Sequence, residues 1–316
     1  MKTKTETGIK EVLKLLEEGN PFRAQEMVSS LYEQDLDSKE LTFTNRCCTF
    51  WIDITKRLRT IQDPFERSQR ILPEWKIFQS FLQRVKTPVY IPALTAMQIG
   101  FFSSALQLYT QLLDERDFVK KIEIYRGAGI CYKEIGNYNN ARVCLVEAND
   151  ICQRNKINAA SIIAELADCY ALCGEERKSK VLFREAFFID PESIDITFLD
   201  SELIKNLIKK TREKGYSGRE LLYWIPVFGS IYRVFNITRD IESNDLSKIK
   251  IDFYAMENEF KDPSCNKKIL IPRLFNYALR LIDFYNLHQE ENMKAINELK
   301  NKMCLWDQGI YEEYIK

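Results

Sequence analysis

The residues best suited to contact a charged ligand form a basic run that leads into a group of aromatic residues. The basic residues lie within 205–219 and are Lys205, Lys209, Lys210, Arg212, Lys214 and Arg219. The aromatic residues are Tyr216, Tyr223, Trp224, Phe228, Tyr232 and Phe235. Cations beside aromatic rings can hold the phosphates and stack the bases of single-stranded nucleic acid. The alternative is structural: cations at the C-terminal end of one helix, followed by a buried helix in which Trp224 and Phe228 are four residues apart.

Residues for catalysis or metal binding are sparse. The nine cysteines are scattered without a CxxC pair, and His288 is the sole histidine, so clustered zinc ligands are missing. The odd number and the scatter of the cysteines favour reduced thiols over a disulfide framework. A single histidine offers few acid–base arrangements, and Ser217 lacks the GxSxG context of an activated serine. The sequence therefore predicts no catalytic residue, no cofactor and no metal site.

Charge and hydropathy restrict the partners and the location. The chain has 46 basic and 46 acidic residues, whereas a nucleic-acid-binding domain usually carries a basic excess. Charged residues interrupt the leucines of the opening MKTKTETGIKEVLKLLEEGN, so it lacks the apolar core of a signal peptide. The most apolar run, 221–235, is shorter than the roughly 20 residues of a membrane-spanning helix. We expect a cytoplasmic protein without a membrane span, for which nucleic acid is a disfavoured partner.

The stretch 126–148, RGAGICYKEIGNYNNARVCLVEA, has glycines at 127, 129 and 136 that could form a phosphate-binding loop or part of a helical hairpin. A phosphate-binding loop follows a strand and opens a helix. No β-branched run precedes Gly127, and the glycine spacing is wrong for such a loop. The sequence therefore favours the hairpin, with Gly136 in its turn and Gly129 at a close approach of two helices.

A glycine followed five residues later by a small residue recurs along the chain. The pattern is clear in GNPFRA, GFFSSA, GNYNNA and GEERKS and weaker in DPFERS. The small residues are at positions 24, 68, 105, 141 and 179, so they are separated by 44, 37, 36 and 38 residues. Upstream of one turn, Tyr125, Ala128, Gly129 and Tyr132 have the spacing of one helix face. Each of the five units is predicted to be a helix, a tight turn and a second helix.

The best-preserved units share a pattern of small and aromatic positions. In one unit these positions are Gly129, Tyr132, Gly136, Tyr138, Ala141, Leu145 and Ala148. In the next they are Ala167, Tyr170, Gly174, Ser179, Phe183, Ala186 and Pro191. The units resemble tetratricopeptide repeats, most closely over 86–191 and weakly over 5–85; Gln153 stands where the family pattern has proline. The resemblance implies an all-α protein with a right-handed superhelical solenoid over 1–195.

The resemblance also implies a concave groove that binds a partner and is lined by the first helix of each unit. The candidate groove residues are Tyr90, Leu94, Met97, Glu123, Arg126, Ile130, Lys133 and Asp168. Gln98 and Glu134 occupy the same groove position in two successive units. Chaperone-binding relatives clamp a C-terminal carboxylate with Lys, Arg and Asn; Arg126 and Lys133 are present here, but the Asn is absent.

The region 196–316 is predicted to be irregular and α-helical, either capping the solenoid or forming an appended domain. Helices are expected at about 195–214, from Ser217 onward with an interruption at Pro226 and Gly229, from a cap at Asn244–Asp245 through Lys248 to Phe260, and at about 274–285 and 291–305. The leading functional hypothesis is a noncatalytic scaffold or adaptor that captures a peptide or helix of a partner protein. The alternatives are a regulatory nucleic-acid-associated protein that uses 205–219, and a helical enzyme with an unrecognised site.

Overall fold

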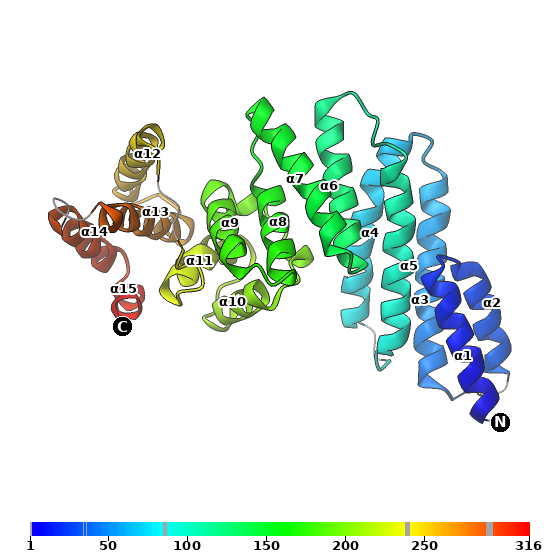
Figure 1. Ribbon diagram of the computed structural model, residues 1–316. Helices are drawn as coiled ribbons and strands as arrows, with labels where there is room; N and C mark the ends of the chain where they lie inside the picture. The colour runs from blue at the N-terminus through cyan, green and yellow to red at the C-terminus, as the bar shows by residue number, and fades with distance from the viewer. Residues whose placement is uncertain (1, 34, 36, 85–86, 238–240, 289–292) are drawn as a thin grey trace. The chain divides into compact units, whose positions relative to one another are not determined.

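The computed structural model describes residues 2–33, 35, 37–84, 87–237, 241–288 and 293–316, and these residues are folded into helices (Figure 1). Within these ranges there are fifteen α-helices, two short 3-10 helices and no strand. The predicted all-α class is thereby confirmed. The chain divides into two compact units, unit 1 over Met1–Lys156 and unit 2 over Ile157–Lys316. This division falls earlier than the boundary after residue 195 that the sequence pattern predicts.

Unit 1 is a packed set of seven helices around an aromatic core. The helices are α1 (Lys2–Glu17), α2 (Pro21–Tyr32), α3 (Lys39–Arg59), α4 (Pro64–Arg84), α5 (Ile91–Thr110), α6 (Phe118–Glu134) and α7 (Tyr138–Asn155). Helix α5 packs against α1, α3, α4 and α6, and α6 packs against α7. The core includes Trp51, Trp75, Phe78, Phe101 and Phe102, whose rings lie within about 6 Å of one another in successive pairs.

Three hairpin turns in the chain have the same backbone geometry. Gly19, Gly136 and Gly174 have φ values of 76°, 82° and 80°, in the left-handed region that glycine adopts without strain. In each turn the residue after the glycine donates its N–H to the carbonyl five residues earlier, at 2.9, 2.8 and 2.8 Å. This is the Schellman pattern, which satisfies the last carbonyls of a helix. The turns predicted at these three glycines are confirmed, and the small residue five positions later is buried in each.

Replacing Gly136 with alanine is expected to destabilise unit 1 by about 1–2 kcal/mol, the cost of a left-handed conformation for a residue with a Cβ. No atom lies within 4 Å of a Cβ built there, so conformation alone sets this cost. Gly136→Asn should lose less, since asparagine tolerates this region. Chemical denaturation of the two variants, compared with exposed Asn139→Ala in the next helix, measures the difference. Equal stability of Gly136→Ala and the control would contradict the turn assignment.

The hairpin of α6 and α7 also confirms the predicted close approach of its helices. A Cβ at Gly129 would lie 2.7 Å from Leu145 Cγ and 3.3 Å from the Ala141 carbonyl oxygen. Ala141 and Leu145 are buried, as expected for the seam. Tyr132, which the sequence spacing places on the same helix face as Gly129, is only half-buried.

The turn predicted at Gly100 is wrong. Helix α5 runs without interruption from Ile91 to Thr110, and Gly100 lies in its middle. A Cβ on Gly100 would be 1.9 Å from the Leu16 carbonyl oxygen, so glycine is needed here for the approach of α1 to α5. The third predicted unit is therefore one long helix. Near its end the Tyr109 hydroxyl donates to the Ser68 carbonyl at 2.6 Å, which ties α5 to α4.

Helix α5 is, among the described residues, the one helix whose length and apolar composition would suffice to cross a membrane. The run 221–235, which appeared the most apolar in the sequence, does not meet that criterion. Eight residues of α5 are buried in unit 1, including Met97, Phe101 and Tyr109. Its contacts with four other helices make it the core helix of this folded unit.

Unit 2 begins with a hairpin and continues as a less regular set of helices. Its elements are α8 (Ala160–Leu172), α9 (Glu176–Ile189), η1 (Pro191–Ser193), η2 (Ile196–Phe198), α10 (Glu202–Glu213), α11 (Gly218–Ile231), α12 (Ser243–Phe260), α13 (Lys267–Leu287), α14 (Met293–Trp306) and α15 (Gln308–Ile315). Helix α11 packs against α9, α10 and α13, and α13 packs against α12 and α14. Trp224, Phe228, Phe235 and Phe275 lie in the interior.

Several predicted helix bounds in unit 2 need correction. The helix expected from residue 195 begins at Glu202, after two 3-10 turns. The helix after Ser217 is continuous across Pro226 and Gly229, and the Ser217 side chain makes no capping hydrogen bond. The short terminal helix α15 was not expected from the sequence pattern.

Candidate binding cleft

The structure buries half of the predicted groove residues. Met97, Ile130, Lys133 and Asp168 are each at most 3% exposed. Tyr90, Leu94, Glu123 and Arg126 are partly exposed. Among the eight candidate groove residues, the remaining open surface is therefore carried by these four side chains.

The predicted groove positions of α5 and α6 are nevertheless adjacent. Gln98 Nε2 donates to Glu134 Oε2 at 2.9 Å, which joins the groove positions of two successive units. Arg126 lies 3.7 Å from Glu123 on its own helix, and Lys133 lies 3.8 Å from Glu134. The two cations suggested for a carboxylate clamp thus differ in access: Arg126 retains exposed surface, whereas Lys133 is buried.

Asp168 has a structural role inside unit 2. Its two carboxylate oxygens accept the backbone N–H groups of Asp200 and Ser201, at 2.7 and 2.8 Å. These N–H groups lie just before α10, where a helix has donors without intrahelical partners. A buried carboxylate that fixes the start of α10 also explains why that helix begins at Glu202 and not at 195.

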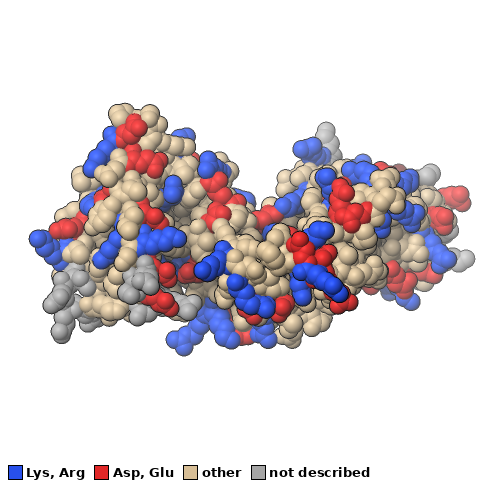
Figure 2. Space-filling view, turned by 90° about the horizontal axis from the view of Figure 1, so that it is seen from above, with Lys and Arg blue, Asp and Glu red and all other residues tan. Residues whose placement is uncertain are grey.

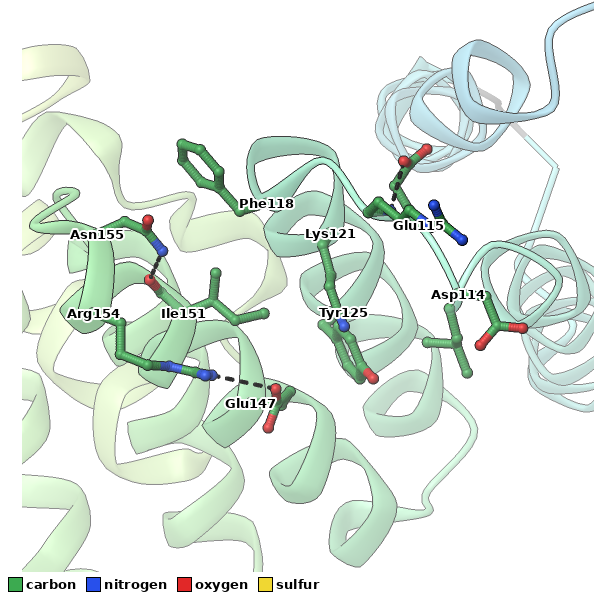
Figure 3. A pocket seen from close by; sticks show the side chains of 11 residues that line it. Asp114, Glu115, Phe118, Lys121, Tyr125, Glu147, Ile151, Arg154 and Asn155 are labelled. Atoms are coloured by element: carbon green, nitrogen blue, oxygen red, sulfur yellow. Dashed lines mark hydrogen bonds and ion pairs between the residues drawn. The ribbon is translucent and has the colours of Figure 1, made fainter.

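An open cleft in unit 1 lies on another face of α6 (Figure 3). Its volume is about 580 Å³, and it is lined by residues 113–116 of the loop before α6 and by side chains of α6 and α7. Helix α6 contributes Phe118, Lys121 and Tyr125. Helix α7 contributes Glu147, Ile151, Arg154 and Asn155. The cleft is thus at the open end of the α6–α7 hairpin, away from the Gly136 turn.

Local sequence explains how the two helices supply these side chains. Asp117 caps α6, because its carboxylate accepts the N–H groups of Val119 and Lys120 at 2.8 and 3.1 Å. Lys121 follows Phe118 by three residues, and Tyr125 follows Lys121 by four, which places the three on one helix face.

The length of α7 depends on Gln153. In the following hairpin α9 has 14 residues and stops at Ile189, before Pro191; α7 has 18 and continues past Gln153 to Asn155. Proline is excluded from the interior of a helix because it lacks an N–H donor and clashes with the preceding turn. The missing proline therefore lets α7 reach Arg154 and Asn155, and it is the sequence signal by which this part of the cleft could have been found.

The cleft combines an apolar floor with charges of both signs. Ile151 is buried, whereas Phe118 is 46% exposed. Arg154 lies 3.5 Å from Glu147 across the α7 surface, and the Lys121 ammonium is 5.8 Å from the centre of the Tyr125 ring. Three acidic and three basic residues line the cleft, so its lining carries no net charge.

The titration of two lining residues reflects these surroundings. Burial raises the pKa of Tyr125, and the nearby Glu147, Cys144 and Asp114 raise it further. The backbone N–H groups of Asp117 and Arg116 lower the pKa of Glu115. Both groups therefore keep their usual ionisation at neutral pH: Tyr125 presents a neutral phenol, and Glu115 a carboxylate held by its own loop. Such a lining can hydrogen-bond and pack against a peptide.

The predicted basic run in unit 2 is exposed, but several of its members are paired. Lys205, Lys214 and Arg219 lie 2.7, 2.8 and 2.6 Å from Asp200, Glu313 and Glu192. The aromatic residues beside the run pack on one another: Trp224 is in contact with Tyr216 and Phe228, and Trp224, Phe228 and Phe235 are buried. On the face shown in Figure 2, basic and acidic residues are interspersed.

The cysteines and acidic residues show no metal-binding arrangement in the described part of the chain. All nine cysteines are free thiols. No group of three or more His, Cys, Asp or Glu side chains in the described ranges is placed to hold a metal ion.

Comparison with protein-family models finds no match, and comparisons with curated proteins and with solved structures find none either.

Proposed function

We propose that this chain is a noncatalytic protein-binding scaffold or adaptor of tetratricopeptide-like hairpins, which captures a peptide segment of a partner. The observation that carries this proposal is the recurrence of one turn geometry at Gly19, Gly136 and Gly174, each with a buried small residue five positions later. A single hairpin cannot bury its own hydrophobic face, so hairpins of this kind stack on neighbours. Stacked hairpins form solenoids whose surfaces bind other proteins.

The cleft at the open end of the α6–α7 hairpin supports peptide capture in unit 1. Its volume of about 580 Å³ suits a few side chains rather than a whole folded domain. Phe118 supplies an exposed ring and Ile151 a buried apolar side chain in the lining of the same cleft, and aromatic residues including Phe are enriched in the cores of protein interfaces. Because Lys121, Arg154 and Glu147 surround this apolar floor, the best-matched ligand is a peptide with an apolar side chain flanked by charges of both signs.

Photo-crosslinking through the cleft tests this proposal. p-Benzoylphenylalanine replaces Phe118 in the full chain, and in a matched chain it replaces Phe22, a 37% exposed residue of α2. Irradiation in cells followed by mass spectrometry should give a discrete partner peptide joined at position 118 and absent at position 22. No adduct at 118, or the same adducts at both positions, would contradict capture at this cleft.

Truncating Phe118 to alanine is expected to weaken binding of the crosslinked partner peptide about tenfold or more, because an aromatic anchor contributes over about 1.4 kcal/mol. The melting temperature should change little, since the ring is half-exposed. Isothermal titration with the peptide identified by crosslinking measures the affinity, and Phe22→Ala serves as the control. Equal affinities of the two variants would exclude Phe118 as an anchor.

A further inference from the structure

A second cleft, the α12 cleft, lies within unit 2 among α9, α12 and α13. Its volume is about 440 Å³, in the range that accepts a small molecule or a few side chains of a peptide. It is independent of the unit 1 cleft, since none of its lining residues belongs to unit 1.

One wall of the α12 cleft is a stack of planar groups. The rings of Phe188 and Tyr277 have their centres 4.8 Å apart, and the Arg280 guanidinium lies 4.9 Å from the centre of the Phe188 ring. Arg280 Nη2 donates to Glu185 Oε2 at 2.8 Å. This arrangement joins α9 to α13 and gives the cleft a flat wall against which an alkyl chain can pack.

Arg280 is an unusual residue for such a wall. Its side chain is 10% exposed, and its Nε–H has no acceptor in the structure. A buried cation with an unmet donor is costly, and apolar residues commonly fill such a position with no loss of stability. The Nε atom has almost no solvent-accessible surface, so a ligand in the cleft does not reach this donor, and its cost falls on the wall itself.

The charges along the cleft determine the sign of a ligand that it can hold. Glu185 already pairs with Arg280, and the remaining charged residues are Glu242, Asp245 and Asp252 against Lys248. Carboxylates near the start of α12 are stabilised by the dipole of that helix. Asp252 lies more than two turns into the helix, where the dipole no longer stabilises a carboxylate. Burial is the main reason why the pKa of Tyr277 is raised. The charge of Asp252 raises this pKa further, whereas the charge of Arg273 lowers it, so the Asp252 carboxylate lies near the Tyr277 phenol. The excess of carboxylates repels an anion and attracts a cation.

We propose that the α12 cleft binds a lysine or arginine side chain of a peptide segment. The alkyl stem packs along Tyr277 and the isoleucines of the cleft, as long basic side chains do on apolar surfaces. The cationic end lies beside Asp245 and Asp252.

Methyl NMR of the full chain tests the proposal, because Ile189, Ile241 and Ile249 line the cleft and report on its occupancy. The probe is a pool of capped pentapeptides, acetyl-X-X-Lys-X-X-amide, in which X is Leu, Ala, Tyr or Ser. A matched pool has norleucine in place of lysine, which keeps the stem and removes the charge. The lysine pool should shift these three methyl signals at millimolar concentration, and the norleucine pool should shift them at least several-fold less. No shift, or equal shifts with both pools, overturns the proposal.

Variants and an internal reference complete the test. The double variant Asp245→Asn/Asp252→Asn should weaken the lysine-pool titration about tenfold, whereas Glu259→Gln, which removes an exposed charge from the same helix, should leave it unchanged. Unchanged titration of the double variant also overturns the proposal. The Ile151 methyl in the unit 1 cleft separates this result from the function proposed above: a shift at Ile151 without a shift in unit 2 assigns the basic peptide to the other cleft and contradicts this one.

Discussion

Replacing Gly100 with alanine is expected to destabilise unit 1 by about 3 kcal/mol or more, the upper range for overpacking a helix contact. The added Cβ would lie 1.9 Å from the Leu16 carbonyl oxygen and 2.8 Å from the Trp51 ring. The nearer atom belongs to the backbone of α1, so no side-chain rotation can relieve the overlap. Helix α1 must move away from α5, which also opens the packing around Trp51. Alanine favours the helix by about 1 kcal/mol relative to glycine, and this gain offsets part of the cost of the overlap. The measured loss of stability is therefore smaller than the packing cost itself.

The control for Gly100 is Thr95→Ala, an exposed position of the same helix where alanine adds propensity without a clash. Thermal unfolding followed by circular dichroism gives the overall stability, and limited proteolysis with mass spectrometry shows whether α1 is the first element to open. The structure predicts a lower melting temperature for Gly100→Ala and a slightly higher one for Thr95→Ala. If Gly100→Ala melts at or above the control, α1 does not approach α5 as closely as the structure shows.

The GFFSSA segment at Gly100 matches the residue pattern of the turns but forms part of a continuous helix. GFFSSA has the same glycine and small residue as GNYNNA, but the residue after the glycine differs. Asn20 and Asn137 follow the turn glycines, and their side chains accept the N–H groups of Arg23 and Asn140, each at 3.3 Å. Phe101 follows Gly100 and is completely buried, which a hairpin turn at the surface does not permit. Glu175, which follows the third turn glycine, makes no side-chain cap but is likewise polar. A polar residue after the glycine therefore distinguishes the turns from the continuous helix better than the glycine does.

The candidate binding residues were less predictable than the hairpins, for a physical reason. A hairpin depends on neighbours in sequence, such as Gly136 and Ala141, whereas exposure depends on elements far along the chain. Met97 and Ile130 have groove spacing, yet both are buried. The unit 1 cleft, by contrast, had a local signal in Gln153, because the absence of proline there allows α7 to extend. The α12 cleft had none, since Glu185 and Arg280 are 95 residues apart and only the packing of α9 on α13 joins them.

Replacing Asp283 with leucine is expected to destabilise unit 2 by about 3–5 kcal/mol, the range for removing one partner of a buried ion pair. Asp283 Oδ2 accepts from Arg184 Nη2, and Arg184 Nη1 donates to the Phe235 carbonyl at 3.1 Å. The Arg184 side chain is 7% exposed, so water cannot replace the lost carboxylate. Burial, with a smaller contribution from the charge of Arg280, lowers the pKa of Arg184 to about 10. The guanidinium therefore remains charged at neutral pH, next to a second cation and without its partner.

Removing both charges of this ion pair should recover most of the loss. In Arg184→Met/Asp283→Leu the buried cation at position 184 is gone, and the cost falls to the unmet Phe235 carbonyl, about 1–3 kcal/mol. Asn286→Leu, an exposed polar-to-leucine change on the same helix, controls for the added apolar surface. Urea unfolding of the wild type, the single variants, the double variant and the control gives the coupling between the two sites. A double variant no more stable than Asp283→Leu would show that the desolvated charge of Arg184 is not the source of the loss. If the double variant is more stable than Asp283→Leu, the loss is due to the unpaired charge of Arg184. The contact of α9 with α13 then depends on a carboxylate that pairs with this charge.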